Sequence, residues 1–241
     1  MCLIVFSYKY PSDYFLVLAS NRDEFYSRAT SQADYWQEDP SIWGGRDLLN
    51  NGTWLGIGKE NRFAFLTNYR NLRLPPIKNP ISRGHLVRDF LLGNDSPDTY
   101  KNLVLEKKDS YEGFNLVFGD QNQAFYLNNK KNLSYRLEPG IYGLSNGVLN
   151  ESWPKTDRTK SAFTDLLNQN KLNDSDAFFS ILSDRSFARV EELPDTGLGM
   201  ERELAISAPF IEVPGYGTRS SCYVALPHQG KAILQEKVYV P

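Results

Sequence analysis

The chain has 241 residues, 41% of them hydrophobic and 13% aromatic, which is enough to bury a substantial core and excludes a disordered chain. Its formal net charge of -2 gives no electrostatic reason to expect nucleic acid or an anionic membrane surface as a partner. The two cysteines and two histidines form neither a disulfide framework nor a metal-ligand pattern, so we expect no metal site.

The N-terminal third predicts two antiparallel β-hairpins. Short apolar runs at 2–7 and 14–20 flank the turn-forming residues of "YKYPSD", and a second pair of runs, at 53–58 and 62–68, flanks "KEN". The first ten residues lack the basic region and cleavage site of a signal peptide. No stretch approaches the roughly 20 apolar residues of a membrane span. We therefore expect a cytoplasmic protein without an integral membrane segment.

The middle and the end of the chain alternate between helix and strand signals. Apolar residues at helical spacing predict helices in 82–94, 157–169 and 174–184, whereas apolar runs predict strands in 114–120, 123–129, 141–146, 220–226 and 231–240. Residues 193–203 read as a long loop. This order favours a single α+β domain over residues 1–241, with helices packed outside antiparallel sheets.

Cys2 stands directly behind the start methionine, in "MCLIVF". One interpretation is a small apolar residue that begins a buried strand. The other is that removal of Met1 leaves Cys2 with both a thiol and a free α-amine, a nucleophile and a base in one residue. An α-amine with a pKa of about 7.7–8.0 can accept the thiol proton near neutral pH. A rigid strand is a suitable mount for such a group.

Five clusters of polar residues lie at the ends of apolar runs. They are "SNRDEF" at 20–25, "WGGRDLLNNGTWLG" at 43–56, "LTNYR" at 66–70, "YGLSNG" at 142–147 and "PGYGTRSS" at 214–221. Together with the "MCLIVF" start, these motifs resemble in sequence and order the NRDE family, also called the transport and Golgi organisation 2 family. The resemblance runs from Cys2 through "YGTR", which is nearly the whole chain.

The resemblance implies a four-layer αββα sandwich of the N-terminal-nucleophile (Ntn) hydrolases, with two packed antiparallel sheets flanked by helices. In the similar cysteine subgroup, the matching positions are Cys2 as nucleophile, Asp23 near the α-amine, Asn68 and Asn146 near the oxyanion, and Arg219. Amide side chains can donate hydrogen bonds to a tetrahedral oxyanion. We expect these five residues to converge in one cleft.

The neighbouring motif residues are expected to contact substrate; they are Asn21, Arg22, Arg46, Trp54 and Tyr69. One position departs from the subgroup, which usually has Arg directly before the Asn of Asn-x-Asp, where this chain has Ser20. Arg22 is a candidate to replace that arginine, although we expect its side chain on the opposite face of the strand.

Three functions remain open. The first is a cofactor-independent hydrolase that acts on a linear amide or thioester of a small acylated metabolite. The second, implied by the resemblance, is a carrier of haem or of lipid and acyl-CoA, for which the sequence has no Cys-x-x-Cys-His motif and only His85 and His228 as imidazole ligands. The third, also from the resemblance, is a factor in secretory or Golgi organisation.

Overall fold

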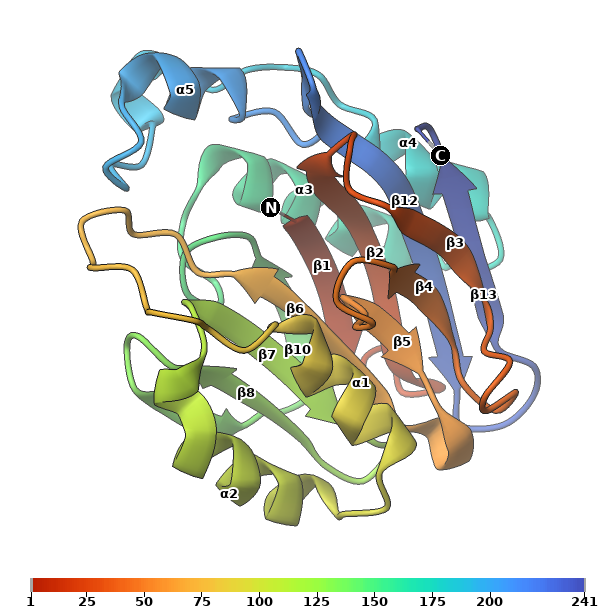
Figure 1. Ribbon diagram of the computed structural model, residues 1–241. Helices are drawn as coiled ribbons and strands as arrows, with labels where there is room; N and C mark the ends of the chain where they lie inside the picture. The colour runs from red at the N-terminus through yellow and green to blue at the C-terminus, as the bar shows by residue number, and fades with distance from the viewer. Residues whose placement is uncertain (1, 241) are drawn as a thin grey trace. The chain divides into compact units, whose positions relative to one another are not determined.

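The computed structural model describes residues 2–240, and the chain divides into two compact units. The first unit holds residues 2–27, 70–73 and 139–240, and the second holds 28–69 and 74–138. Each unit is built on one antiparallel sheet (Figure 1). Whether residues 1–241 form a single domain, as the sequence favours, stays a prediction.

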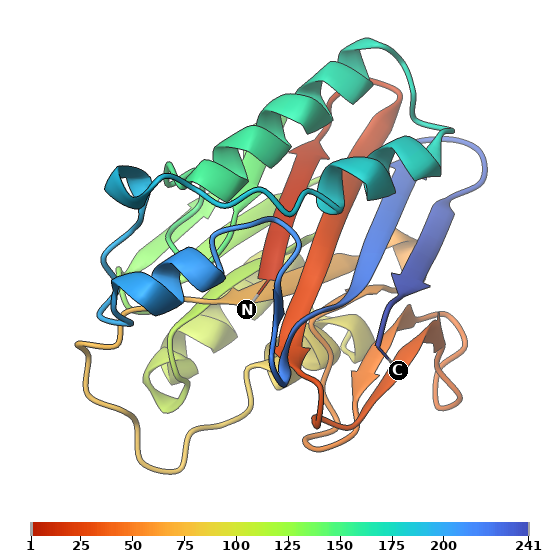
Figure 2. The same ribbon diagram turned by 90° about the horizontal axis from the view of Figure 1, so that it is seen from above.

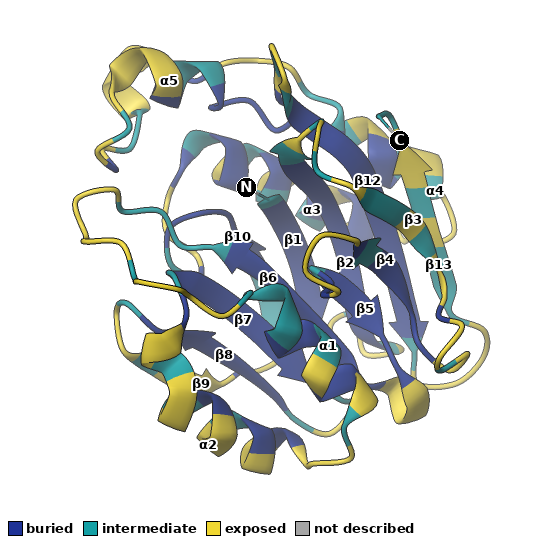
Figure 3. Ribbon diagram, in the orientation of Figure 1, coloured by how far each residue is buried: buried dark blue, intermediate teal, exposed yellow. Residues whose placement is uncertain are grey.

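The sheet of the first unit has the strand order β10-β1-β2-β12-β11, with β13 also paired to β12. Its strands are β1 (Cys2–Tyr8), β2 (Tyr14–Phe25), β10 (Gly140–Leu144), β11 (Glu212–Val213), β12 (Tyr216–Pro227) and β13 (Ile233–Val238). Strand β1 lies between β10 and β2, so Cys2 begins an interior strand. Strands β1, β2 and β12 are almost entirely buried (Figure 3).

Helices α3 (Pro154–Asn168) and α4 (Ser175–Leu182) cover one face of this sheet (Figure 2). The third helix of the unit is α5 (Met200–Ala205). Because side chains alternate along a strand, Val17 and Ala19 of β2 and Tyr223 of β12 point to the same face, where they pack with Phe163 and Phe178. The rings of Phe178 and Tyr223 stack with centroids 4.2 Å apart. This packing fixes the direction in which every odd-numbered residue from 17 to 23 of β2 points.

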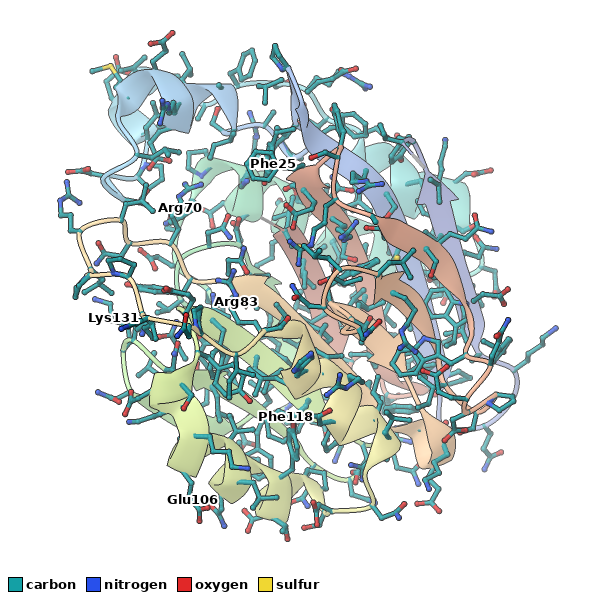
Figure 4. The ribbon with its side chains drawn as sticks, viewed as in Figure 1. Phe25, Arg70, Arg83, Glu106, Phe118 and Lys131 are labelled. Carbon is teal, nitrogen blue, oxygen red and sulfur yellow. The ribbon has the colours of Figure 1, made fainter. Side chains whose placement is uncertain are left out.

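The second unit is a seven-stranded antiparallel sheet in sequential order. Its strands are β3 (Thr30–Tyr35), β4 (Trp43–Asp47), β5 (Leu55–Ile57), β6 (Phe63–Asn68), β7 (Phe114–Gly119), β8 (Ala124–Asn128) and β9 (Leu133–Arg136), and its helices are α1 (Gly84–Leu92) and α2 (Pro97–Lys107). Aromatic rings join the helices to the sheet: Phe118 of β7, labelled in Figure 4, lies 5.0 Å from Phe90 and 5.3 Å from Tyr100 between centroids.

The structure confirms the expected hairpins and the final strand pair, and it adds elements that the patterns did not indicate. Helix α2 has a weak apolar stripe, although Ser96 caps it and Pro97 occupies its first turn, which are both usable start signals. The expectation of a loop at 193–203 is partly wrong, because α5 begins at Met200. Within residues 2–240, none of the helices combines the length and the apolarity that crossing a membrane requires.

Candidate active site

Cys2 and Arg22 face each other across the antiparallel pair of β1 and β2. Directly opposed residues in such a pair point to the same face of the sheet. Ser20 is paired in the same way with Ile4, so Ser20, Arg22 and Cys2 share a face. The expectation that Arg22 points away from the position of Ser20 is therefore wrong, because residues two apart on a strand lie on the same side. Arg22 stands beside Cys2, where its positive charge favours the thiolate.

Asp23 follows Arg22 on β2, and its side chain points to the helix-covered face. Only 1% of Asp23 is exposed, and its Oδ1 accepts a 2.7 Å hydrogen bond from Thr218 Oγ1 on β12. Its backbone N–H donates to the Cys2 sulfur. Burial raises the pKa of the Asp23 carboxyl above its ordinary value, while the positive charge of Lys155 and the Thr218 hydrogen bond act in the opposite direction.

The Cys2 thiol is partly buried, and this burial raises its pKa above the ordinary value for cysteine. The Asp23 carboxylate adds to the rise, whereas the Arg22 guanidinium and the Asp23 backbone N–H oppose it. The thiol is therefore protonated at neutral pH, and a reaction through the thiolate needs a base that removes its proton.

Asn146 is placed next to Cys2 by the pairing of β10 with β1. The ladder ends at the pair Ile4–Leu144, and the following residue, Ser145, donates from Oγ to the Cys2 carbonyl at 3.2 Å. Asn146 is fully buried, and its carbonyl accepts a 2.8 Å hydrogen bond from the backbone N–H of Arg70. The turn after β10 thus holds Asn146 on the Cys2 side of the sheet's edge.

Arg219 occupies a β-bulge in β12. Thr218 pairs with Asp23 and Ser220 pairs with Arg22, which leaves Arg219 as the extra residue between them. Arg219 is 3% exposed, and its guanidinium donates to the carbonyls of Phe25 at 3.3 Å and Val240 at 3.4 Å. Its backbone therefore lies beside the Asp23 segment, and a direct role of its side chain at Cys2 stays a prediction.

Asn21 is fully buried on the helix-covered face, and its side chain is tied to protein groups. Its Nδ2 donates to the carbonyls of Leu182 at 2.8 Å and Pro209 at 2.9 Å, and its Oδ1 accepts from Ser221 Oγ. Both amide protons and the amide oxygen are engaged. A contact of Asn21 with substrate stays a prediction. In the structure, the Asn21 side chain connects β2 to the end of α4.

The other motif residues belong to the second unit; they are Arg46, Trp54, Asn68 and Tyr69. Asn68 ends β6 and pairs with Phe114, while the Tyr69 backbone N–H donates to Gly113 at 2.9 Å. Arg46 forms an ion pair with Glu38 and lies over the ring of Trp36 at 4.2 Å. Their approach to Cys2, including the expected role of Asn68 at the oxyanion, stays a prediction.

Lys155 is a charged residue of this region that the sequence patterns did not single out. It follows Pro154 in the first turn of α3, is 3% exposed, and donates from Nζ to the Ile206 carbonyl at 3.1 Å. Burial lowers its pKa to about 8, with the Asp23 carboxylate as the largest opposing influence. A lysine in a first helical turn is usually solvated, so nothing in "WPKTD" signals this burial.

Arg70 and Glu203 form a second buried feature that the sequence did not reveal. Arg70, labelled in Figure 4, donates from Nη2 to Glu203 Oε2 at 2.6 Å, and the two side chains are 8% and 3% exposed. Arg70 also donates from Nε to Thr196 Oγ1 at 3.0 Å and lies over the Trp153 ring. The segment 70–73 is thereby anchored to the first unit.

In the part of the chain that the structure describes, no three His, Cys, Asp or Glu side chains gather in a way that could hold a metal ion. The charged side chains that act on the Cys2 thiol are the Arg22 guanidinium, which lies opposite Cys2, and the Asp23 carboxylate. This set is suited to proton transfer and to carbonyl polarisation.

Over residues 1–241 the chain matches the family described as "Transport and Golgi organisation 2". Among similar proteins are the Transport and Golgi organization protein 2 homologs of Bos taurus and Homo sapiens, each 32% identical over 98% of this chain and 92% of its own length. These matches confirm the family resemblance that the ordered motifs indicated.

A similar solved structure is the Caenorhabditis elegans N-acylethanolamine-hydrolyzing acid amidase ortholog. It has a TM-score of 0.51 and 13% sequence identity, and the match covers 82% of this chain and 95% of that one. At this identity the similarity shows the fold alone. It confirms the expected Ntn-hydrolase-like α+β fold, with antiparallel sheets and flanking helices.

Proposed function

The chain belongs to the Transport and Golgi organisation 2 family, and on that premise we propose that it is a hydrolase in which Cys2 attacks a linear amide or thioester of a small acylated molecule. The observation that carries the proposal is the setting of the Cys2 thiol. It begins an interior strand, faces Arg22 and accepts a hydrogen bond from the Asp23 backbone. The fold shared with a chain described as hydrolysing N-acylethanolamines also supports it.

The proposed reaction needs removal of Met1, which frees the α-amine of Cys2. The amine accepts the thiol proton, the sulfur attacks the substrate carbonyl carbon, and the C–N or C–S bond breaks as the leaving amine or thiol takes up that proton. Water then adds to the acyl-thioester of Cys2, the C–S bond breaks, and the sulfur regains a proton as the carboxylic acid departs. No cofactor takes part.

The neighbouring residues have separate roles in this proposal. The Arg22 cation favours the thiolate, and the Asp23 carboxylate orients the α-amine. The amide of Asn146, with that of Asn68 as a second donor, stabilises the oxyanion of the tetrahedral intermediate. One such donor contributes about 2.7–4 kcal/mol to transition-state stability.

The test compares four proteins on a panel of acyl-amides and acyl-thioesters: the chain with Met1 removed, verified by intact mass, Cys2→Ser, a form with one residue added before Cys2, and Cys222→Ser. Cys222→Ser is the matched control, because it makes the same chemical change on β12. We expect hydrolysis by the first and last proteins, and a loss of at least about a hundredfold in the other two.

Haem and acyl-CoA titrations of the same four proteins examine the carrier alternative. Binding that is equal in all four, together with hydrolysis that is unchanged in Cys2→Ser, would overturn the hydrolase proposal and leave Cys2 as a structural residue. Hydrolysis that depends on Cys2 upholds it, whatever the titrations give.

A further inference from the structure

The turn after β10 is bonded to Cys2 at one residue and to Arg70 at the next. Ser145 donates from Oγ to the Cys2 carbonyl at 3.2 Å, and the Asn146 carbonyl accepts a 2.8 Å hydrogen bond from the backbone N–H of Arg70. Ser145 and Asn146 are at most 3% exposed. The backbone of Arg70 therefore contacts the residue that directly follows the contact with Cys2.

The guanidinium of Arg70 is held in one orientation by two acceptors. Its Nη2 donates to Glu203 Oε2 at 2.6 Å, and its Nε donates to Thr196 Oγ1 at 3.0 Å. Glu203 is fixed in turn, because its Oε1 accepts from the backbone N–H of Thr196 at 3.3 Å and from the Thr196 hydroxyl. A guanidinium is planar and presents its donors in a rigid fork, so two such acceptors set its orientation. The position of Arg70 therefore depends on α5 and on the segment before it.

Trp153 connects the same guanidinium to the turn by packing. The guanidinium carbon of Arg70 lies 5.1 Å from the centroid of the Trp153 ring. On the other side, a β-carbon added to Gly147 would lie 3.1 Å from Trp153 Nε1 and still closer to Glu151 Oε2. The residue after Asn146 is therefore closely packed, and its neighbours leave no space for a side chain.

Stability alone is a weak reason to bury this ion pair. The side chains of Arg70 and Glu203 are 8% and 3% exposed. Removing two charges from water is costly, and uncharged residues of similar volume often replace a buried ion pair without loss of stability. A cavity of about 10 Å³ borders Arg70, Trp153 and Glu203, which is close to the volume of one water molecule and far below that of a substrate. The pair is therefore suited to orient neighbouring groups and not to bind a ligand.

We propose that Arg70 is a positioning residue for the Cys2 site, and that its ion pair with Glu203 holds the turn of Ser145 and Asn146 against the start of β1. The backbone N–H of Arg70 transmits the effect to Asn146, and Ser145 transmits it to Cys2. The proposed reaction uses the amide of Asn146 at the oxyanion, so the catalytic consequence rests on the proposed function. The dependence of the turn on the ion pair does not.

The test removes both charges at once, in the double variant Arg70→Met/Glu203→Gln. No buried charge is then left without a partner, and an amide oxygen remains at position 203 to accept from Thr196. The matched control is Arg73→Met/Asp195→Asn, which removes the exposed ion pair between the same two segments. Urea unfolding verifies that both variants are folded under the assay conditions.

Hydrogen exchange measures the turn directly and needs no substrate. The backbone N–H of residue 70 donates to the Asn146 carbonyl, so its exchange rate reports how often this contact opens. After correction for intrinsic rates, we expect it to rise about tenfold or more in Arg70→Met/Glu203→Gln relative to amides of the β1–β2 ladder, and to stay near the wild-type value in the control. In protein made with ¹⁵N-labelled asparagine, the side-chain signal of Asn146, assigned with Asn146→Ser, should shift in the first variant only.

An exchange rate at residue 70 that is unchanged in Arg70→Met/Glu203→Gln, or an unchanged Asn146 signal, overturns the inference. If this double variant fails to fold, Thr196→Val gives the second measurement, because it removes one of the two acceptors of the Arg70 guanidinium. It should speed exchange at residue 70 in the same direction, and a wild-type rate in Thr196→Val would overturn the inference as well.

Hydrolysis assays separate this inference from the proposed function. With an active substrate, Arg70→Met/Glu203→Gln should lower kcat about tenfold with little change in KM, whereas Arg73→Met/Asp195→Asn should keep the wild-type kcat. If Cys2→Ser leaves hydrolysis unchanged while exchange at residue 70 is faster, the proposed function fails and the link between the ion pair and the turn stands. If hydrolysis depends on Cys2 but Arg70→Met/Glu203→Gln keeps the wild-type kcat, the positioning role fails.

Discussion

Thr218 donates a 2.7 Å hydrogen bond to the carboxylate of Asp23, although 195 residues separate them in sequence. The same hydroxyl oxygen accepts from the backbone N–H of Ile211 at 2.9 Å. Thr218 therefore connects the carboxylate beside Cys2 to the segment that leads into β12. Each of these groups is buried, so the loss of the hydroxyl leaves polar atoms without compensation.

Thr218→Val should destabilise the protein by about 1.5–3 kcal/mol at neutral pH, the range for a hydrogen bond to a charged group. The bond lowers the Asp23 pKa, so its loss costs most where the carboxyl is ionised in the folded protein. The difference from wild type should therefore shrink as the pH falls through the folded pKa of Asp23. Urea unfolding at pH 7 and pH 4 measures it. Thr164→Val, which removes a hydroxyl bonded to a neutral carbonyl, is the control and should show no such pH dependence.

Cys2 should react with iodoacetamide at neutral pH faster than Cys222. Cys222 is 2% exposed, and burial together with Glu236 raises its pKa well above the ordinary value. The Cys2 pKa is also raised, so its alkylation rate should keep rising with pH through the neutral range instead of levelling off. Peptide mass analysis of partly alkylated native protein gives both rates. Equal rates, or a Cys2 rate that levels off below pH 7, would contradict the environment described.

Lys155 should make stability rise with pH between about 8 and 10. Its folded pKa of about 8 lies below the unfolded value of 10.5, so in this window the unfolded chain binds more protons and unfolding becomes less favourable as the pH increases. Over two pH units the effect is on the order of 2–3 kcal/mol. Denaturant unfolding of wild type and of Lys155→Met at pH 8 and pH 10 isolates the contribution of Lys155, because the tyrosines titrate alike in the two proteins. If the free energies of unfolding of the two proteins differed by the same amount at pH 8 and pH 10, the pKa of Lys155 would not be lowered in the folded protein.

Glu203→Gln should destabilise the fold by about 3–5 kcal/mol, because it leaves the buried Arg70 charge without its partner. The pair Arg73–Asp195 offers a matched control, with the same 2.6 Å separation but side chains that are 57% and 80% exposed. Asp195→Asn should therefore change stability far less than Glu203→Gln does, because water screens this exposed pair. A double-mutant cycle with Arg70→Met measures the coupling energy between Arg70 and Glu203. If Glu203→Gln and Asp195→Asn destabilised the protein to a similar extent, the burial of the Arg70–Glu203 pair would be contradicted.

The strands that carry Cys2 and Asp23 could be predicted from the sequence, because apolar alternation and turn residues mark their length and pairing. The sequence was also sufficient for the strand that ends in "YGLSN", which pairs with β1, whereas a role of Asn146 at Cys2 stays a prediction. Side chains alternate between the two faces of a strand, so the sequence also predicts that Arg22 lies on the same face as Ser20. The expectation that Arg22 lies on the opposite face did not take this alternation into account. The burial of Lys155 and Glu203 was not predictable, because it depends on where α3 and α5 pack and not on their own residue patterns.

The bulge at Arg219 absorbs one residue of β12 without changing which groups meet across the two strands. Ser221 and Tyr223 point to the helix-covered face, and with Arg219 in the chain strict alternation would put Thr218 on the other one. The extra residue reverses the alternation, so Thr218 reaches Asp23. Deleting Arg219 would remove the bulge and leave Ser220 opposite Arg22 and Thr218 opposite Asp23 in a regular ladder. A homologous gene that is one codon shorter at this point would therefore keep the same hydroxyl on its aspartate and lose only the arginine.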